Sequence, residues 1–228
     1  DCPPWSIKAE KITHDKIKKD MIYKNAILKV YDVPVMYFPK FFHPDPSVKR
    51  RSGFLRPQFN NSETLGSSLY IPYFKTLGHN KDLTFKPTLF EKHTKFEKEK
   101  YLLQTEFRKQ NKSSFLITDV GLLRDYKPLF DKKRRNANHL FLDFIGDLNL
   151  PNYSESGFEA QIERVNNDTY LKAFQNVLTQ SPVMPESLST MNSNFKFYFD
   201  KEDQNLSTGV EIYENLGSKN SDRYQYTL

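Results

Sequence analysis

The chain has 228 residues, enough for one large or two small domains. Its apolar content of 37% is low, whereas aromatic residues reach 14%, a combination that favours a sheet with many half-exposed strands over a helical bundle. The net charge of +6 raises the question of nucleic-acid binding, but basic and acidic residues are interspersed, which favours a solvated surface. The single cysteine, Cys2, excludes a disulfide or a cysteine-based zinc site closed within this chain, and no apolar run approaches a membrane-spanning helix.

The first 46 residues are predicted to form a separate region of strands. In "WSIKAEKI" (5–12), apolar and charged residues alternate, which is the pattern of a half-buried strand. Residues 21–42 continue as short strand-like runs, broken by "YDVP" and by a later proline. The following "HPDPS" (43–47) is predicted to be an extended connector, because its two prolines disfavour helix.

Two consecutive strand-like segments after this connector each contain a proline. Pro57 lies within "VKRRSGFLRPQF" (48–59), and Pro72 lies within "SLYIPYF" (68–74). Proline has no N–H to donate to a neighbouring strand and is normally confined to sheet edges or bulges. From the residues alone, these prolines are most simply explained as strand ends.

The rest of the chain repeats strand-like segments with a period of two residues. Each segment has about the nine to eleven residues that cross a bilayer at a tilt, or slightly fewer. Short turns alternate with long loops such as 123–137 and 166–190, as in the connections of an outer-membrane barrel. Within the second loop, 166–178 has helical spacing, and Asp168 is a candidate cap. The predicted strands are 82–90, 100–108, 113–123, 139–148, 158–165, 194–202 and 207–216.

No catalytic or metal-binding constellation is found, so we expect neither an enzyme nor a cofactor. No serine lies in a strand–turn–helix context, and the 8 glycines form no phosphate-binding loop. Asp143 and Asp147 share one side of a predicted strand but lack an acid–base partner. None of the histidines has metal-ligand spacing, and each is expected at the surface or in an interface. The histidines are His14, His43, His79, His93 and His139.

Two basic clusters stand out from the interspersed charges. One precedes the first proline-containing strand, and the other lies in the 123–137 loop. On charge alone, both are expected to be solvated loops. The alternative is that they bind phosphates or other acidic groups of a lipid headgroup, because arginine offers a permanent charge and bidentate hydrogen bonds. The clusters are Lys49, Arg50 and Arg51, and Lys132, Lys133, Arg134 and Arg135.

Several motifs follow one another in a fixed order. They are a W-x-[IV] strand start, an H-D pair, "NAILKV", "PVMYFP" and the specific "KRRSGFLRP". "YIPYF", "DLTFKPTLF", "TEFR" and "VNNDTYLKAF" come later. Together they resemble the LPS-assembly outer-membrane protein family (LptD, also called OstA or Imp). The resemblance covers nearly the whole chain and is strongest over 1–108.

This resemblance implies an all-β, antiparallel architecture in two parts. Residues 1–46 would be the last strands of a periplasmic β-jellyroll, 47–52 a junction, and 53–228 the first ten or so strands of a large up-and-down outer-membrane β-barrel. We expect an internal fragment, because no signal peptide begins the chain and the strand-like "RYQYTL" (223–228) ends it. Family members receive lipopolysaccharide from a periplasmic bridge of jellyroll proteins (LptA-like). They hold a plug lipoprotein (LptE-like) in the barrel and release lipopolysaccharide through a lateral gate.

The resemblance also implies roles for individual residues. The first barrel strand would begin at Gly53 and border the gate, so that Pro57 and Pro72 would weaken its pairing and let the seam open. Both basic clusters would contact the lipopolysaccharide headgroup, with Lys49, Arg50 and Arg51 at the junction and Lys132 to Arg135 outside. Cys2 corresponds to a periplasmic cysteine of the family whose disulfide partner would lie beyond this chain.

Three other functions remain open. A general porin has the same strand pattern, but it requires neither the separate segment 1–46 nor the prolines. A soluble periplasmic lipid carrier, with a lone jellyroll or a lipocalin-like sheet, is disfavoured because the strands run far beyond eight. An outer-membrane lipase would need a Ser–His pair, and none is visible. No nucleic acid or metal is expected as a partner.

Overall fold

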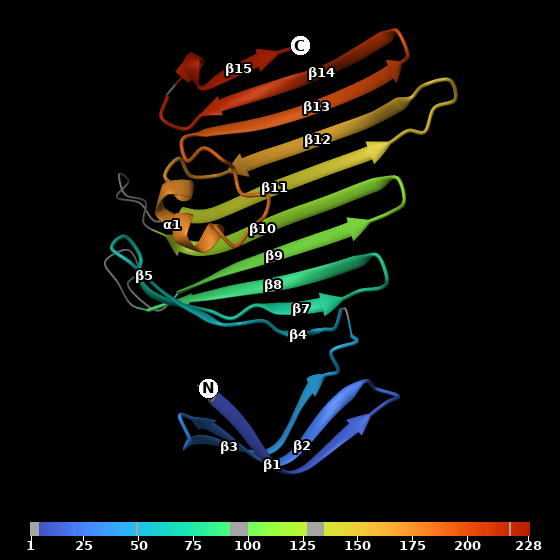
Figure 1. The fold of residues 1–228 in the computed structure, drawn as a ribbon. Helices are drawn as coiled ribbons and strands as arrows, with labels where there is room; N and C mark the ends of the chain where they lie inside the picture. The colour runs from blue at the N-terminus through green and yellow to red at the C-terminus, as the bar shows by residue number, and fades with distance from the viewer. Residues whose placement is uncertain (1–4, 49, 92–99, 127–134, 219) are drawn as a thin grey trace. The chain divides into compact units, whose positions relative to one another are not determined.

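A computed structural model shows two compact units, residues 1–51 and 52–228, each built of antiparallel strands (Figure 1). The boundary lies inside the junction expected at 47–52. The two units are described separately below. The structure describes residues 5–48, 50–91, 100–126, 135–218 and 220–228.

The smaller unit is a three-stranded sheet of β1 (Trp5–Asp15), β2 (Asp20–Val30) and β3 (Val33–Pro44), in that order. The break expected at "YDVP" is present as the turn of a β2–β3 hairpin, whereas the break expected at the later proline is wrong, because β3 continues through Pro39 to Pro44. The two turn residues of the hairpin, 31 and 32, have φ of 46° and 65°, as a tight two-residue hairpin turn requires. The prolines in β3 are accommodated because β3 pairs on one side only.

The larger unit is a 12-stranded sheet whose order follows the chain, from β15 at one edge to β5 at the other. Its first two long strands are each split into two pieces, so that β4 pairs with β7 while β5 pairs with β6. Both β6 and β7 then pair with β8. The split strands are β4 (Gly53–Phe54), β5 (Gln58–Ser62), β6 (Gly66–Tyr70) and β7 (Tyr73–Thr76).

The remaining strands confirm the period-two segments predicted from the sequence. Short turns join them at one end of the sheet, and longer connections lie at the other end (Figure 1). A short 3₁₀ helix, η1 (Asn220–Arg223), precedes the last strand. The strands are β8 (Lys81–Phe90), β9 (Lys100–Gln110), β10 (Ser114–Tyr126), β11 (Arg135–Asp147), β12 (Glu155–Val165), β13 (Thr190–Lys201), β14 (Gln204–Asn215) and β15 (Tyr224–Thr227).

The connection after β12 contains the α-helix α1 (Tyr170–Leu178), which supports the helical spacing seen in the sequence. Asp168 does not cap it, so that expectation is wrong. The residue at the N-cap position is Thr169, and it makes no side-chain cap hydrogen bond. The Asp168 carboxylate accepts a hydrogen bond from Arg223 at 2.7 Å instead, which joins this connection to η1.

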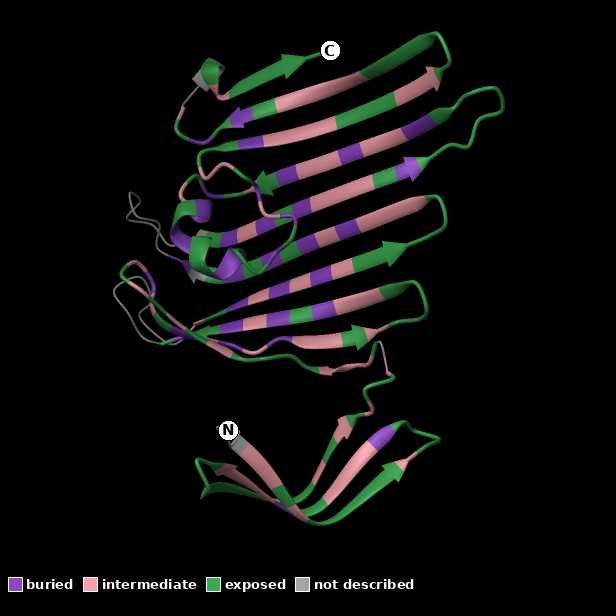
Figure 2. Cartoon of the chain, viewed as in Figure 1, coloured by how far each residue is buried: buried purple, intermediate pink, exposed green. Residues whose placement is uncertain are grey.

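The core of the larger unit lies between α1 and one face of the sheet. Apolar residues recur along α1 at helical spacing and pack on the strands beneath. Figure 2 shows buried residues concentrated in α1 and the strands under it. The core includes Phe90, Leu102, Ile117, Leu123 and Phe141 from the strands, and Tyr170, Leu171, Phe174, Val177 and Leu178 from α1.

Candidate functional site

The pairing between the first two long strands of the larger unit is interrupted. β4 and β7 stay in register as far as Phe54 opposite Tyr73, and β5 and β6 resume with Gln58 opposite Tyr70. Three residues of the first strand therefore face only two of the second, which is the geometry of a β-bulge. Pro57 is the third of the three residues. Gly53 starts β4, and a Cβ added to it would have no other atom within 4 Å.

Two further prolines lie at the same level of the sheet. The Leu55 N–H donates to the Pro72 carbonyl at 2.9 Å, and the Ile71 N–H donates to the Pro87 carbonyl at 3.0 Å. The N–H and C=O of one residue in an antiparallel strand point to the same side. Pro72 therefore lacks the donor that would face the first strand, and Pro87 lacks the donor that would face the second.

Pro87 was not singled out from the sequence as a weak point. The register places it opposite Ile71, so that the interruption crosses two neighbouring ladders. A signal was present, because Pro57, Pro72 and Pro87 recur every 15 residues. In a meander of strands and tight turns, such a recurrence can place equivalent residues on consecutive strands.

The predicted basic residues are described only in part. The Arg51 Nη2 donates to an Asp20 carboxylate oxygen at 2.9 Å, and its guanidinium carbon lies 6.0 Å from the centre of the Phe42 ring. Arg50 is exposed, and Arg135 is the first residue of β11. Cys2, Lys49, Lys132, Lys133 and Arg134 lie outside the described residues.

One face of the larger sheet leaves apolar side chains exposed, whereas the covered face combines the apolar core with buried polar and charged side chains. On one face, a cross-strand row of mostly apolar side chains crosses six strands and is partly or fully exposed. The neighbouring row on the opposite face contains the polar side chains of Lys86, Gln104 and His139. These side chains are buried beside the α1 segment, which is residues 166–189 between β12 and β13. The exposed row is Phe54, Tyr73, Phe85, Thr105, Val120 and Leu140.

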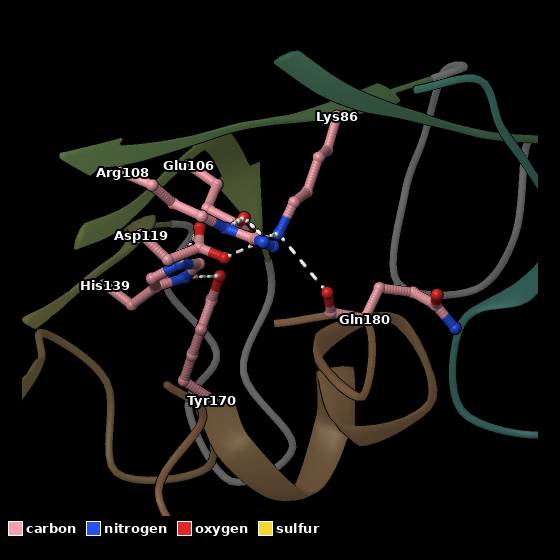
Figure 3. Close-up of polar contacts among 7 residues, drawn as sticks. All are labelled: Lys86, Glu106, Arg108, Asp119, His139, Tyr170 and Gln180. Carbon is pink, nitrogen blue, oxygen red and sulfur yellow. Dashed lines mark hydrogen bonds and ion pairs between the residues drawn. The ribbon is translucent and has the colours of Figure 1, made fainter. Parts of the chain in front are cut away.

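A cluster of buried charged side chains lies on the covered face, beside the α1 segment (Figure 3). The Lys86 Nζ is 2.5 Å from a Glu106 oxygen and 3.0 Å from an Asp119 oxygen, and all three residues are at most 2% exposed. The Arg108 Nε also donates to Glu106, at 2.5 Å. Two positive groups thus balance two carboxylates, which is how proteins tolerate buried charge.

The same cluster binds both ends of α1. The Lys86 Nζ donates to the backbone carbonyl of Gln180, two residues after the helix, at 3.3 Å. At the other end, the His139 Nδ1 lies 2.7 Å from the Tyr170 hydroxyl, and its Nε2 lies 3.2 Å from Asp119. Burial, with the Asp119 charge adding to it, raises the pKa of the Tyr170 hydroxyl well above its usual value. The protonated hydroxyl can donate to Nδ1 while Nε2–H donates to Asp119.

His139 therefore corrects the expectation that every histidine lies at the surface or in an interface. It is 3% exposed, and its ring stacks on Phe141 with the ring centres 4.4 Å apart. Gly121, directly opposite on β10, makes the space, because a Cβ there would lie 2.2 Å from the imidazole Cε1. A glycine inside a strand signals such a close approach.

The chemistry of this cluster is anchoring. Its charged groups bind one another and the α1 segment. Within the described ranges, no group of three or more His, Cys, Asp or Glu residues could hold a metal ion. No described helix has both the length and the apolar character that a membrane crossing requires.

No protein-family model matches the chain. Curated proteins named "LPS-assembly protein LptD" are similar to it. The one from Shewanella sp. (strain ANA-3) is 38% identical over 111 residues, 47% of this chain and 14% of that protein. The one from Legionella pneumophila (strain Paris) is 29% identical over 181 residues, 75% of this chain and 20% of that protein. The one from Polaromonas sp. (strain JS666) is 26% identical over 197 residues, 85% of this chain and 23% of that protein. The chain is thus similar to less than a quarter of the length of each of these relatives.

Proposed function

We propose that the chain is a segment of an outer-membrane lipopolysaccharide-assembly protein of the LptD family. In this proposal, residues 1–46 are the last strands of a periplasmic β-jellyroll, and residues 53–228 are the first ten or so strands of a transmembrane barrel. Support comes from the relatives named LptD and from the sheet, in which β4–β5 and β6–β7 count as one strand each.

The observation that carries the proposal is the polarity of the larger sheet. In water, the exposed face of a sheet is polar and the covered face is apolar. Here Phe85, Val120 and Leu140 lie on the exposed face, whereas the covered face buries Lys86 and Asp119 beside the apolar core. This arrangement suits an exposed face in hydrocarbon and a covered face toward the barrel interior. A general porin is less well supported, because a pore requires neither the separate segment 1–46 nor the prolines at the interrupted ladder.

The interrupted ladder supports a lateral gate at the first barrel strand. Lipopolysaccharide would arrive along a periplasmic bridge of LptA-like jellyrolls, pass a barrel that holds an LptE-like plug lipoprotein, and leave beside β4 and β5. Each missing ladder bond removes about 1 kcal/mol of net stability in water, and more in hydrocarbon, where no water replaces it. The bulge at Pro57 and the missing donor at Pro72 would lower the free energy needed to detach this strand.

The basic clusters and Cys2 take their proposed roles from the same architecture. Arg50 and Arg51, with Lys49, would guide the anionic headgroup from the jellyroll to the gate, and the cluster from Lys132 to Arg135 would contact it outside. The Asp20 carboxylate that binds Arg51 would then have to exchange for a phosphate. Cys2 would form a disulfide with a cysteine outside this chain.

The test replaces Pro57 and Pro72 together by valine in the full-length protein. Restored backbone donors should tighten the ladder and slow the arrival of pulse-labelled lipopolysaccharide at the cell surface several-fold. The control is Pro151→Val, in the exposed turn between β11 and β12. Surface arrival at the unmodified rate in the double variant, with correct barrel assembly, would contradict the gate.

A further inference from the structure

The net positive charge of the chain is concentrated in the smaller unit. Residues 1–51 contain 11 Lys and Arg against 6 Asp and Glu, whereas residues 52–228 contain 23 against 22. The smaller unit thus carries five of the six net charges on fewer than a quarter of the residues. The even mixture of basic and acidic residues inferred from the whole sequence is therefore a property of the larger unit only. The excess of positive charge on the smaller unit favours an anionic ligand there.

Three of these basic residues form a single row across the sheet. Lys11 on β1 is directly opposite Lys24 on β2, which is directly opposite Lys40 on β3. Directly opposite residues point to the same face, with Cβ atoms about 5 Å apart. The row therefore places three ammonium groups on one face, over two strand spacings or about 10 Å. All three lysines are exposed.

The nearby carboxylates are engaged elsewhere. Asp15 accepts the backbone N–H groups of residues 17 and 18 in its own turn, Asp20 binds Arg51, and Glu10 accepts a hydrogen bond from the Asn25 amide. None of the ion pairs found among the described residues involves a lysine of the row. Like charges directly opposite each other destabilise a sheet. The row thus keeps two repulsive contacts that a single acidic substitution would relieve.

The row borders apolar surface. Two residues further along each strand, on the same face, Thr13 is opposite Ile22 and Ile22 is opposite Phe42. Phe42 is 57% exposed, and the Arg51 guanidinium lies over its ring. Because Asp20 compensates the Arg51 charge, the positive charge available beside the apolar patch is that of the lysine row. Exposed apolar side chains beside a row of cations match an amphiphile with an anionic headgroup.

We propose that the lysine row, Lys11, Lys24 and Lys40, binds the phosphate groups of a phosphorylated glycolipid. The inference rests on the proposed function, and it names residues and a surface beyond it. Lysine ammonium groups bind phosphate as mobile point charges, which suits a headgroup that passes along a sheet rather than remaining in one pose. Phospholipid headgroups share this chemistry and are the competing source of the phosphate.

The test measures lipid binding by the full-length protein in phosphatidylcholine nanodiscs. The probes are bisphosphorylated lipid A, the same lipid A after removal of both phosphates, and phosphatidylglycerol as competitor. The variant Lys11→Gln/Lys24→Gln/Lys40→Gln should bind bisphosphorylated lipid A at least about tenfold more weakly, since lost charge-assisted hydrogen bonds have effects of this size. Its binding of dephosphorylated lipid A should not change, and the corresponding triple arginine variant should retain binding.

The matched control is Lys8→Gln/Lys16→Gln/Lys18→Gln, which removes three exposed charges from the same unit but outside the row. Three outcomes would overturn the proposal. The control variant could bind as weakly as the row variant, or the row variant could keep wild-type affinity. Phosphatidylglycerol at equal concentration could also displace bisphosphorylated lipid A completely. Equal wild-type binding of both lipid A forms would overturn the lysine row alone. Failure of the wild-type protein to bind either form would contradict the proposed function itself.

Discussion

At the scale of residues, Lys86 is a lysine buried among carboxylates. Replacing a whole buried ion cluster by apolar residues is often neutral, whereas removing one partner is strongly destabilising. The Lys86 cluster is therefore better explained by specificity than by stability. Its contacts with Gln180 and, through His139, with Tyr170 fix where the α1 segment docks on the sheet.

We expect Lys86→Met to loosen the α1 segment. Asp119 would lose its lysine partner while still buried, and it would regain water only when the segment lifts. If the variant destabilises the docked state of the segment by about 3 kcal/mol, the fraction of molecules in which the segment is lifted rises about a hundredfold. Hydrogen exchange of the α1 amides should accelerate by up to that factor.

The controls for this variant separate charge from side-chain volume. Lys109→Met removes an exposed lysine from neighbouring β9 and should leave α1 exchange unchanged. Adding Asp119→Asn to Lys86→Met removes the orphaned charge and should restore much of the protection. Unchanged α1 exchange in Lys86→Met would show that the cluster does not hold the segment.

At the scale of elements, α1 is held by its apolar face as well as by its polar ends. Phe174 packs edge-on against Phe90 and Tyr126, with ring centres 6.1 Å and 5.1 Å away, and it stacks on Tyr170 at 4.8 Å. These contacts join the helix to β8 and β10. The helix and the sheet face beneath it thus form one packed layer.

Phe174→Ala should therefore detach α1 from the sheet. Loss of a buried phenylalanine costs about 3–5 kcal/mol, a large part of which opposes docking. Lys172 is exposed on the same helix, so trypsin can report opening by cleavage there. We expect cleavage at least tenfold faster than in the unmodified protein, and no change for Gln175→Ala, which alters an exposed neighbour. Equal cleavage rates in both variants would mean that the apolar face does not hold α1.

The elements themselves were largely predictable from the sequence, because strand alternation is local. The segments from 82 to 216 match β8 to β14 closely, and the helical spacing near 170 matches α1. The contacts between elements were not predictable. Lys86, Glu106 and His139 occupy ordinary polar positions in alternating strands, and only the strand register and the fold-back of α1 bring them together. Asp168 is not the cap, because α1 begins at Tyr170 with Thr169 at the N-cap position, and the Asp168 carboxylate binds a distant arginine instead.

At the scale of the whole unit, the same limit applies to the two faces of the sheet. Alternation predicts that Val120 and Asp119 point to opposite sides of β10, but it does not predict which side is covered. The structure covers the Asp119 side, where α1 docks, and exposes the Val120 side. A bilayer around the exposed face, as proposed above, would favour the exposure of its apolar row.

Val120→Lys tests which medium surrounds the exposed face. Val120 lies near the middle of β10, between Thr105 and Leu140 in the exposed row. If lipid surrounds this face, a lysine near the bilayer midplane costs about 2–4 kcal/mol, and insertion of the full-length protein into lipid vesicles should fall at least tenfold. Ser113→Lys places the same charge in an exposed turn, where the cost is about 0–1 kcal/mol, so insertion should be nearly normal. If both variants inserted equally well, the exposed apolar row would face water or another protein surface, and the barrel assignment would be lost with it.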